Sequence, residues 1–412
     1  MAEAYQPQDR LSLWWLANPA QPVRVGDIAL QYGGRGVTLR YGANWLRTGF
    51  PLSEDLPLVD ELFVPHEKDM AAGAVDDARP DRWGERVIRR FEASPRMSLL
   101  EYLFFAGDDR YGALGVSQAD DQYQPWDRSP MPRLDSLDSM ADAVRKVLAN
   151  EAVSELQRRL VRPGASLGGA RPKSLIEIDG EAWLVKFSEG EEINTPLVEH
   201  ACMSLARLCG VQTADTRALP VGKVHAVAVR RFDRSQGARI HAVSAHVALR
   251  AAGDAEMSYI NLAQWLRRRA PAAAIAQQQA QLFRRMVFNI LVDNTDDHEK
   301  NHALLRQADG NYVLSPAYDV VPSAQGLGYQ AMAVAALEGG QGTESSLVNA
   351  LLSARYFGLK DKAARQIMAG ICRQVAGWKA YFSALGVQAH DVDLLAQYID
   401  GDRLGRQRAE FL

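Results

Sequence analysis

The chain has 412 residues, of which 47% are apolar and 24% charged, and its formal net charge at pH 7 is −3. The length suggests two or three compact domains, and the composition is that of a globular protein with enough apolar side chains for a buried core. A protein built mainly to hold nucleic acid normally carries a basic excess, so direct DNA binding by the chain as a whole is disfavoured, which leaves room only for a local basic patch.

The cysteines and the N-terminus indicate a reducing compartment. Cys202, Cys209 and Cys372 are an odd number without a Cys-x-x-Cys pair, which argues against a disulfide framework or a cysteine zinc site. The first ten residues, MAEAYQPQDR, lack the basic and apolar regions of a signal peptide, and the nearest apolar run, 11–17, is too short to span a bilayer. We therefore expect a cytoplasmic protein without a membrane segment.

The first 125 residues are expected to form a β-rich domain. Segments 23–32 and 36–41 alternate in polarity or carry β-branched residues, with glycines between them, as β-strands do. Apolar residues at helical spacing predict a helix over 80–106. The acidic, proline-containing stretch 118–139 has no periodicity and is interpreted as a linker, which places the first domain at 1–125.

Two further domains are expected beyond the linker. A helix is predicted over 140–161 and another over about 195–209, which Gly210 would end. Strand-like runs are expected at 174–178, 182–187 and 224–232. These elements predict a small α+β lobe at 140–240. From about 244 onward the apolar pattern is mostly helical, which predicts a helical lobe at 241–412.

A strongly polar segment follows the apolar helix pattern of the third domain. Residues 293–302 read DNTDDHEKNH, a cluster that is costly to bury without a cation or ordered partners. Within it Asn301 follows Asp296 by five positions, and a separate acid, Asp319, lies in the later segment SPAYDVVP. Phosphoryl transfer needs a carboxylate for the attacking hydroxyl and oxygen ligands for Mg²⁺. The catalytic loop of protein kinases has the same Asp-x4-Asn spacing, followed by a distal acid.

A glycine-rich segment upstream is suited to covering phosphate groups. Residues 164–174 read GASLGGARPKS, and glycines allow backbone N–H groups to approach phosphate oxygens closely. Lys186 follows in the strand-like run WLVKF, where a lysine suits a point-charge contact with phosphate. Glu199, in the next predicted helix, is a candidate to orient that lysine. Glycine loop, strand lysine, helix glutamate, Asp-x4-Asn and distal Asp follow one another in the order found in kinases.

Together these motifs resemble the HipA family of bacterial kinase toxins. The similar stretches in the second and third domains are SLGGARPKS (166–174), WLVKF (183–187), VAVRRFDR (227–234), LVDNTDDHEKNHALL (291–305) and LSPAYDVVPS (314–323). The first domain resembles the family's first subdomain through YGANWL (41–46), FPLSEDLPL (50–58) and LEYLFFAGDDRYGALGV (100–116). The resemblance covers nearly the whole chain, and its most specific part is the Asn-Thr-Asp-x-His-x-Lys-Asn core.

The resemblance implies an α+β, bilobed protein-kinase-like fold with an extra N-terminal β-rich subdomain and a mostly helical C-terminal lobe. It implies that Asp296 is the catalytic residue and that Asn301 and Asp319 are Mg²⁺ ligands, while Glu199 orients Lys186. For ATP it implies contacts from the glycine loop, the two lysines, the hinge and two loop side chains: Ser166, Leu167, Gly168, Gly169, Ala170, Lys173, Lys186, Arg231, Phe232, Asp233, His298 and Tyr318.

The implied activity is that of an ATP- and Mg²⁺-dependent serine/threonine protein kinase that silences itself by autophosphorylation of Ser166. Substrates in the family are translation components, notably aminoacyl-tRNA synthetases. The usual partner is a small helix-turn-helix antitoxin, which brings the kinase to operator DNA, so DNA would be contacted only indirectly. The sequence departs from the family at Arg230, where an acid is common, and it matches poorly over 235–260.

Three alternative functions use parts of the same motifs. The pentapeptide His298-Glu299-Lys300-Asn301-His302 fits the H-E-x-x-H motif of zinc metallopeptidases, which works only on a helix, but it explains neither the glycine loop nor Asp319. A P-loop fails because Ala170 stands at the lysine position. A non-catalytic kinase-fold repressor partner should lack one of the kinase residues, and all of them are present.

Single residues also have structural interpretations. Asp319 could form a turn, Lys186 could protect an edge strand from aggregation, and His298 could brace its loop. Glu199 could be an ordinary solvated helical glutamate, and Ser166 a plain loop serine.

Overall fold

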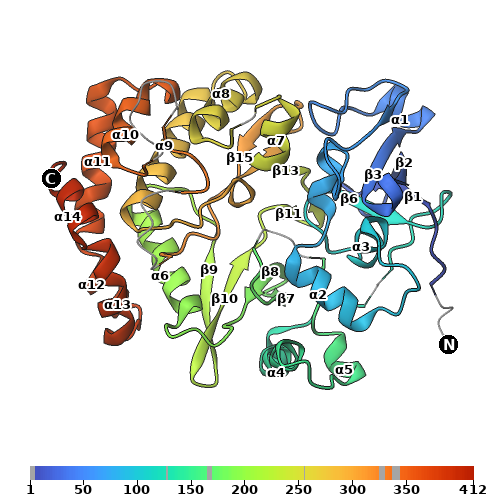
Figure 1. Cartoon of the computed structure of the whole chain (residues 1–412), viewed down its shortest axis with the longest axis horizontal. Coiled ribbons are helices and arrows are strands. Elements are labelled where there is room, and N and C mark those ends of the chain that lie inside the picture. The colour runs from blue at the N-terminus through green and yellow to red at the C-terminus, as the bar shows by residue number, and fades with distance from the viewer. Residues whose placement is uncertain (1–4, 127–128, 165–168, 255, 324–329, 336–343) are drawn as a thin grey trace. The chain divides into compact units, whose positions relative to one another are not determined.

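The computed structural model describes residues 5–126, 129–164, 169–254, 256–323, 330–335 and 344–412 (Figure 1). The chain divides into two compact units, one formed by residues 1–189 and 231–243 and the other by residues 190–230 and 244–412. The predicted linker at 118–139 lies inside the first unit. The predicted domain ranges 1–125, 140–240 and 241–412 stay predictions.

A six-stranded, mainly antiparallel sheet forms the N-terminal part of the first unit, within the residues described. Its strands are β1 (Arg10–Trp15), β2 (Val23–Gln31), β3 (Gly36–Tyr41), β4 (Leu62–Phe63), β5 (Met70–Ala71) and β6 (Leu114–Ser117). The order is β4-β3-β2-β1-β6, and β5 pairs with β3 in parallel. The strands predicted at 23–32 and 36–41 are therefore confirmed as β2 and β3, and all residues of β3 except Arg40 are buried.

Helices of the first unit pack around this sheet and beyond it. They are α1 (Ala43–Thr48), α2 (Arg82–Phe91), α3 (Leu99–Phe105), α4 (Leu137–Leu148) and α5 (Glu155–Arg158), with 3-10 turns at Tyr32–Gly34, Gly73–Ala78 and Leu134–Ser136. Helix α3 packs on β2, β3 and β6, and all seven of its side chains are buried.

Two sequence-based helix predictions were wrong in their extent. The single helix predicted over 80–106 is two helices, because Pro95 interrupts the pattern and Ser98 begins α3 with a capping box that includes Glu101. The helix predicted over 140–161 ends at Leu148, and the short α5 begins at the capping residue Ser154.

A hairpin of β7 (Lys173–Ile178) and β8 (Glu181–Lys186) confirms the strands predicted at 174–178 and 182–187. Its turn residues Asp179 and Gly180 have φ of 55° and 77°, as a two-residue type I′ hairpin turn requires. The same unit contains the small hairpin of β11 (Arg234–Ser235) and β12 (Ala238–Arg239). Strand β13 (Ala242–Ser244) lies at the boundary between the units.

The second unit is mostly helical, as predicted for the chain from about residue 244 onward. Its helices are α6 (Thr195–Leu208), α7 (Ala245–Ala251), α8 (Tyr259–Arg269), α9 (Ile275–Leu291), α10 (Leu347–Ser353), α11 (Asp361–Val375), α12 (Trp378–Ala384), α13 (Ala389–Ile399) and α14 (Asp402–Ala409), with 3-10 turns at Glu299–Asn301 and Ala354–Phe357. Its hairpins are β9 (Thr216–Val221) with β10 (Val224–Arg230), and β14 (Ala303–Arg306) with β15 (Tyr312–Leu314). Helix α9 is the centre of this unit and packs against α8, α10 and α11 (Figure 1).

Within the described part of the chain, no helix combines the length and the apolar character needed to cross a lipid bilayer.

Candidate active site

The polar loop at residues 292–302 begins where α9 ends. The apolar face of α9 stops at Leu291, and backbone N–H groups of Asp293 and Asn294 close the helix by donating to the carbonyls of Ile290 and Asn289. Asp293 has a left-handed φ of 54° and accepts a hydrogen bond of 3.1 Å from Arg403. The turn therefore redirects the chain immediately after the helix.

Asp296 is held by its backbone and exposes its carboxylate. Ser323 Oγ accepts hydrogen bonds from the N–H groups of Thr295 and Asp296, at 2.8 and 3.1 Å. The Ser323 N–H donates in turn to the carbonyl of Asp293 at 3.0 Å. Asp296 is exposed, whereas Thr295 and Asp297 on either side are buried. The loop therefore presents one carboxylate at a fixed position on its surface.

Asn301 is buried behind Asp296 and has an unsatisfied acceptor. Its Nδ2 donates to the Asp296 carbonyl at 3.3 Å, and its N–H donates to the His298 carbonyl at 2.9 Å. Its Oδ1 is buried and has no hydrogen-bond partner among the described residues. Because a buried oxygen without a donor is costly, such an atom calls for a ligand, and a hard cation is one that amide oxygens bind. Asn301 therefore fits the role of Mg²⁺ ligand.

Asp319 lies on a second segment, which is hydrogen-bonded to the loop through residues before and after Asp319. Tyr318 Oη donates to the Lys300 carbonyl at 2.7 Å, and Ser323 makes the backbone contacts described above. Asp319 itself has a left-handed φ of 56°, a conformation that is uncommon for a residue other than glycine and one that aspartate tolerates best. The structure thus places the two segments that carry Asp296, Asn301 and Asp319 in contact within the second unit.

A buried polar group supports the loop from below and was not predicted from the sequence. Asp297 accepts hydrogen bonds from Tyr259 Oη and from His302 Nε2, the latter at 3.0 Å, and Asn289 Nδ2 donates to Tyr259 Oη at 3.0 Å. Burial, together with Asp297, raises the pKa of Tyr259 well above its usual value, so the phenol stays protonated as a donor. Of the tandem acids, Asp297 therefore stabilises the fold and Asp296 faces outward.

The two histidines of the loop do not form the zinc-peptidase motif. Residues Glu299–Asn301 form one 3-10 turn rather than an α-helix, so His298 and His302 do not share a helix face. His302 bonds to Asp297 in the core. No group of three or more His, Cys, Asp or Glu side chains suited to a metal is found among the residues described. The geometry that a zinc metallopeptidase requires is thus missing from this loop.

His298 and Glu299 brace the loop. His298 Nδ1 accepts a hydrogen bond of 3.2 Å from the Lys300 N–H, as the structural interpretation of this histidine predicts. Glu299 Oε1 lies 2.9 Å from His246 Nδ1, and this hydrogen bond lowers the pKa of the carboxyl to about 2. Contact of His298 with a nucleotide stays a prediction.

The glycine-rich segment is described only in part. Ser166, Leu167 and Gly168 lie outside the described residues, so their predicted roles stay predictions. Gly169 and Ala170 are exposed, and Gly169 has a left-handed φ of 84°. Gly164 has a packing role, because a Cβ there would lie 2.1 Å from the Ala106 carbonyl oxygen.

Lys173 and Lys186 lie directly opposite each other in the β7–β8 ladder, and both are buried. Like charges in such a pair destabilise a sheet unless anions are near. Asp81, which caps the N-terminus of α2, pairs with Lys173 Nζ, and this amine also donates to the Gly169 carbonyl at 3.2 Å. Burial of Lys186 argues against an exposed edge-strand role, and its contact with phosphate stays a prediction.

The predicted hinge residues belong to a buried ion-pair network of the first unit. Arg231 makes two hydrogen bonds to Asp233, at 2.8 and 2.6 Å, and the Gly112 N–H and Arg234 also donate to Asp233, each at 2.8 Å. Burial acts to raise the pKa of Asp233, but Arg231 and Arg234 together hold it below its ordinary value. Phe232 contacts Tyr111 edge to face. A contact of these residues with adenine stays a prediction.

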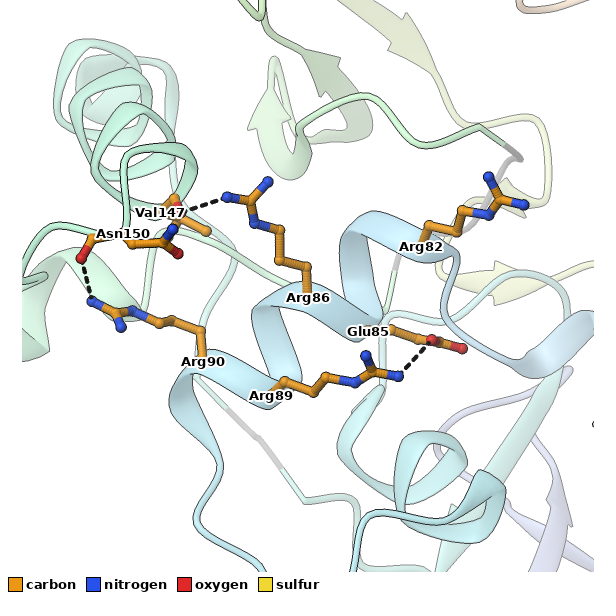
Figure 2. A pocket seen from close by; sticks show the side chains of 7 residues that line it. All are labelled: Arg82, Glu85, Arg86, Arg89, Arg90, Val147 and Asn150. Carbon is orange, nitrogen blue, oxygen red and sulfur yellow. Dashed lines mark hydrogen bonds and ion pairs between the residues drawn. The ribbon is translucent and has the colours of Figure 1, made fainter. Parts of the chain in front are cut away.

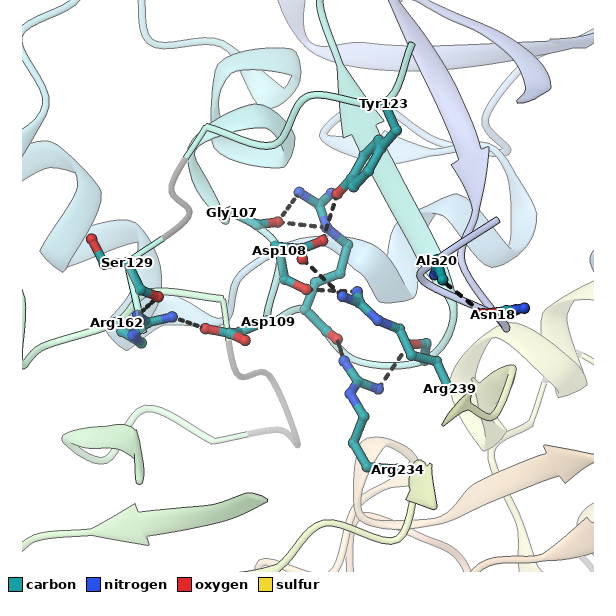
Figure 3. Close-up of polar contacts among 12 residues, drawn as sticks. Asn18, Ala20, Gly107, Asp108, Asp109, Tyr123, Ser129, Arg162, Arg234 and Arg239 are labelled. Atoms are coloured by element: carbon teal, nitrogen blue, oxygen red, sulfur yellow. Dashed lines mark hydrogen bonds and ion pairs between the residues drawn. The ribbon is translucent and has the colours of Figure 1, made fainter. Parts of the chain in front are cut away.

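The same network extends to the turn at residues 107–112 (Figure 3). Arg234 Nη2 donates to the Arg110 carbonyl at 2.8 Å, and Arg239 donates to the carbonyl and carboxylate of Asp108 at 2.7 and 2.9 Å. Tyr123 Oη donates to the same carboxylate at 2.7 Å. Every carboxylate of the network drawn there is paired.

Glu199, on α6 of the second unit, is fully buried, so it is not a solvated surface residue.

Two family models match the chain. One, described as the HipA-like C-terminal domain, matches residues 165–378, and the other, the HipA N-terminal domain, matches residues 20–117. A curated relative named as the putative kinase Y4dM of Sinorhizobium fredii is 29% identical over 154 residues, and this match spans 34% of the chain and 37% of the relative.

A solved structure of HipA shows the same fold. HipA of Shewanella oneidensis, in a complex with HipB and operator DNA, matches with a TM-score of 0.66 and 17% identity, covering 97% of this chain and 99% of that one. A weaker match is the Helicobacter pylori proinflammatory kinase CtkA, with a TM-score of 0.45 and 12% identity over 59% of this chain and 92% of that one. The fold is therefore the α+β, protein-kinase-like fold of HipA, as the sequence predicts.

Proposed function

The chain belongs to the family of HipA-like proteins, and on this premise we propose that it is an ATP- and Mg²⁺-dependent serine/threonine protein kinase that acts as the toxin of a toxin–antitoxin pair. One observation carries the proposal. In the second unit an exposed Asp296, the unsatisfied Oδ1 of Asn301 and Asp319 lie on two loops that are hydrogen-bonded to each other.

The three side chains would divide the work of phosphoryl transfer. Asp296 would orient the substrate hydroxyl and accept its proton as the new oxygen–phosphorus bond forms and the bond between the β- and γ-phosphates breaks. Asn301 Oδ1 and Asp319 would hold Mg²⁺, which supplies charge neutralisation to the phosphates when bound. Ser323 and Tyr318 join the two loops by hydrogen bonds. The side chains of Asp296, Asn301 and Asp319 would therefore be positioned before the substrate binds.

Groups of the first unit would bind the nucleotide. Lys186 is buried in a strand, and its ammonium group would contact the anionic phosphates. The backbone N–H groups of the glycine loop would cover the phosphates, and Ser166 in that loop would be the autophosphorylation site that silences the kinase. Peptide mass spectrometry after incubation with ATP tests this, and phosphate found only at other residues would remove Ser166 from this role.

The proposed partners follow from the family. HipA of Shewanella oneidensis is seen with HipB and operator DNA. We propose that this chain likewise binds a small helix-turn-helix antitoxin and reaches DNA through it. The proposed substrate is a translation component such as an aminoacyl-tRNA synthetase.

Incubation of the full chain with γ-labelled ATP, Mg²⁺ and a cell lysate tests the activity, followed by identification of the labelled proteins. We expect labelling by the wild type and by Asp402→Asn, which removes an exposed carboxylate outside the proposed site. Asp296→Asn should not label any protein. Near-normal labelling by Asp296→Asn would exclude the catalytic role, and labelling by neither the wild type nor the control would exclude the kinase.

A further inference from the structure

Helix α2 carries an exposed row of arginines beside a surface pocket of about 430 Å³ (Figure 2). The residues that line this α2 arginine pocket are Arg82, Glu85, Arg86, Arg89, Arg90, Val147 and Asn150. At about 100° per residue, the four arginines fall within about a third of the helix circumference. The apolar side chains of the helix, such as Trp83 and Val87, are buried on its other side. The exposed face of α2 is therefore almost purely cationic.

Two of the arginines are held in place by the end of α4. Arg86 Nη2 donates to the carbonyls of Val147 and Leu148, at 3.2 and 2.8 Å. Arg90 Nη2 donates to the carbonyls of Asn150 and Glu151, at 3.2 and 2.7 Å. The bonds of Arg86 satisfy the last carbonyls of α4, as basic groups commonly do at a helix C-terminus, and those of Arg90 satisfy two carbonyls that follow the helix. They use one nitrogen of each guanidinium, so further N–H donors remain for a ligand.

Arg82 has no such structural role. It is exposed, makes no hydrogen bond or ion pair among the described residues, and stands at the first position of α2. A positive charge there is unfavourable against the helix dipole. Residues that break a local rule in this way are expected at functional sites.

Acidic side chains near the pocket are already paired with arginines. Glu85 pairs with Arg79 and Arg89, and Glu92 pairs with Arg158. Glu151, whose carbonyl accepts from Arg90, pairs its carboxylate with Arg145. Among the residues that the structure describes, these pairs leave Arg82, Arg86 and Arg90 without a carboxylate partner, so the pocket attracts anions.

We propose that the α2 arginine pocket binds the phosphodiester backbone of a nucleic acid directly, beyond the contact with DNA through an antitoxin. From Arg82 to Arg90 the helix rises about 12 Å, the length of about three phosphates along one strand of a duplex. The arginine fork suits phosphate oxygens. A membrane is disfavoured because the apolar side chains of α2 are buried, apart from the half-buried Phe91, whose ring lies under the Arg158 guanidinium. An acidic peptide is disfavoured because Val147 is the single apolar residue lining the pocket, too little for an anchor.

Fluorescence anisotropy with labelled duplex DNA and labelled single-stranded RNA tests the proposal on the full chain. Between about 50 and 200 mM salt, release of counterions from three phosphates should weaken duplex binding by about 40-fold. Arg82→Gln should weaken binding several-fold at the lower salt, equally for different sequences, and should reduce the slope of log K against log salt by about 1. The matched control is Arg406→Gln, which removes an exposed arginine of α14 and should bind as the wild type does.

The DNA and RNA arms show which nucleic acid the pocket prefers, and binding of either supports the proposal. Unchanged affinity and salt slope in Arg82→Gln would overturn it, as would absence of binding by the wild type at the lower salt. Displacement by polyglutamate as effective per charge as displacement by RNA would assign the pocket to an acidic peptide instead. The test is independent of kinase activity, because Arg82 is not one of the proposed catalytic or ATP-binding residues.

Discussion

Two polar clusters of this protein differ in whether a buried side-chain oxygen at their centre has a hydrogen-bond donor. Around Asp233 in the first unit, the carboxylate receives Arg231, Arg234 and a backbone N–H. In the loop at 292–302 of the second unit, Asn301 Oδ1 is buried without a partner among the described residues, and Asp296 is exposed. A cluster that satisfies itself stabilises the fold, whereas one that leaves an acceptor open is arranged for a ligand.

The largest difference between the two clusters is expected when one carboxylate of each is replaced by an amide. Asp296→Asn should lower the rate of phosphoryl transfer by about 10²–10⁴-fold, the usual contribution of a general base. Because the side chain is exposed, the free energy of unfolding should change by less than about 0.5 kcal/mol. Urea denaturation and a single-turnover assay measure the two quantities. A large loss of stability would show that Asp296 stabilises the fold, which would contradict a purely catalytic role.

Asp233→Asn should have the opposite profile. It leaves the buried Arg231 and the half-buried Arg234 beside a neutral amide, which should lower the free energy of unfolding by about 3–5 kcal/mol. The matched control is Asp60→Asn, which breaks an exposed pair with Arg40 and should cost about 0–1 kcal/mol. Equal urea midpoints for the two variants would show that the network around Asp233 is not structural.

Asn301→Ala tests the unsatisfied acceptor. Removal of the side chain loses one hydrogen bond to the Asp296 carbonyl, so the free energy of unfolding should fall by only about 1 kcal/mol. If Oδ1 is a ligand, Mg²⁺-dependent affinity for ATP should fall by at least about 10-fold, since even residues that only support a ligand contribute that much. Calorimetric titration with and without Mg²⁺ measures this, and an unchanged affinity would reject the ligand role.

The smallest effect is expected at Glu299, a paired residue inside the second cluster. Its pKa is lowered to about 2 by His246, so its carboxylate stabilises the fold above the unfolded value of 4.5, and this contribution is lost as pH falls toward 2. Because the group is partly exposed, screening limits the contribution to about 1 kcal/mol. Glu299→Gln should show this deficit in urea midpoints at neutral pH and progressively less below pH 4.5.

Glu410→Gln, which changes an exposed glutamate at the end of the chain, is the control for Glu299→Gln and should match the wild type at every pH. A deficit of Glu299→Gln that grows as the solution is acidified would contradict the assignment.

Much of the fold could be predicted from local pattern. Strands β2, β3, β7 and β8 and the helical character of the second unit follow from side-chain periodicity and from turn residues such as Asp179-Gly180. Strand β9 was not predicted, because Pro220 interrupts its pattern. A proline is tolerated there because β9 is an edge strand, which pairs only with β10 among the strands that the structure describes. The division of 80–106 into two helices also escaped the apolar pattern, although Ser98 and Glu101 carry its signal.

The candidate site was predictable in its residue types and less so in its contacts. Asp296 and Asn301 are only five positions apart, so a single loop can carry both. In the structure they lie on the same loop and are joined by a hydrogen bond. The contact of Tyr318 with Lys300 and that of Ser323 with the N–H group of Asp296 join segments that no local pattern connects. The supporting group of Tyr259, Asp297 and His302 was missed for the same reason.

The sequence alone determined the family, the loop that carries the acid and the amide, and the strands and helices that surround it, because these depend on residues a few positions apart. Only the tertiary structure decided that Asp297 faces inward while Asp296 faces outward, and that Lys173 meets Asp81 from 92 positions away. Burial and ion pairing are set by which distant segments pack together, and the free energy of a charge depends on that surrounding rather than on its neighbours in the chain.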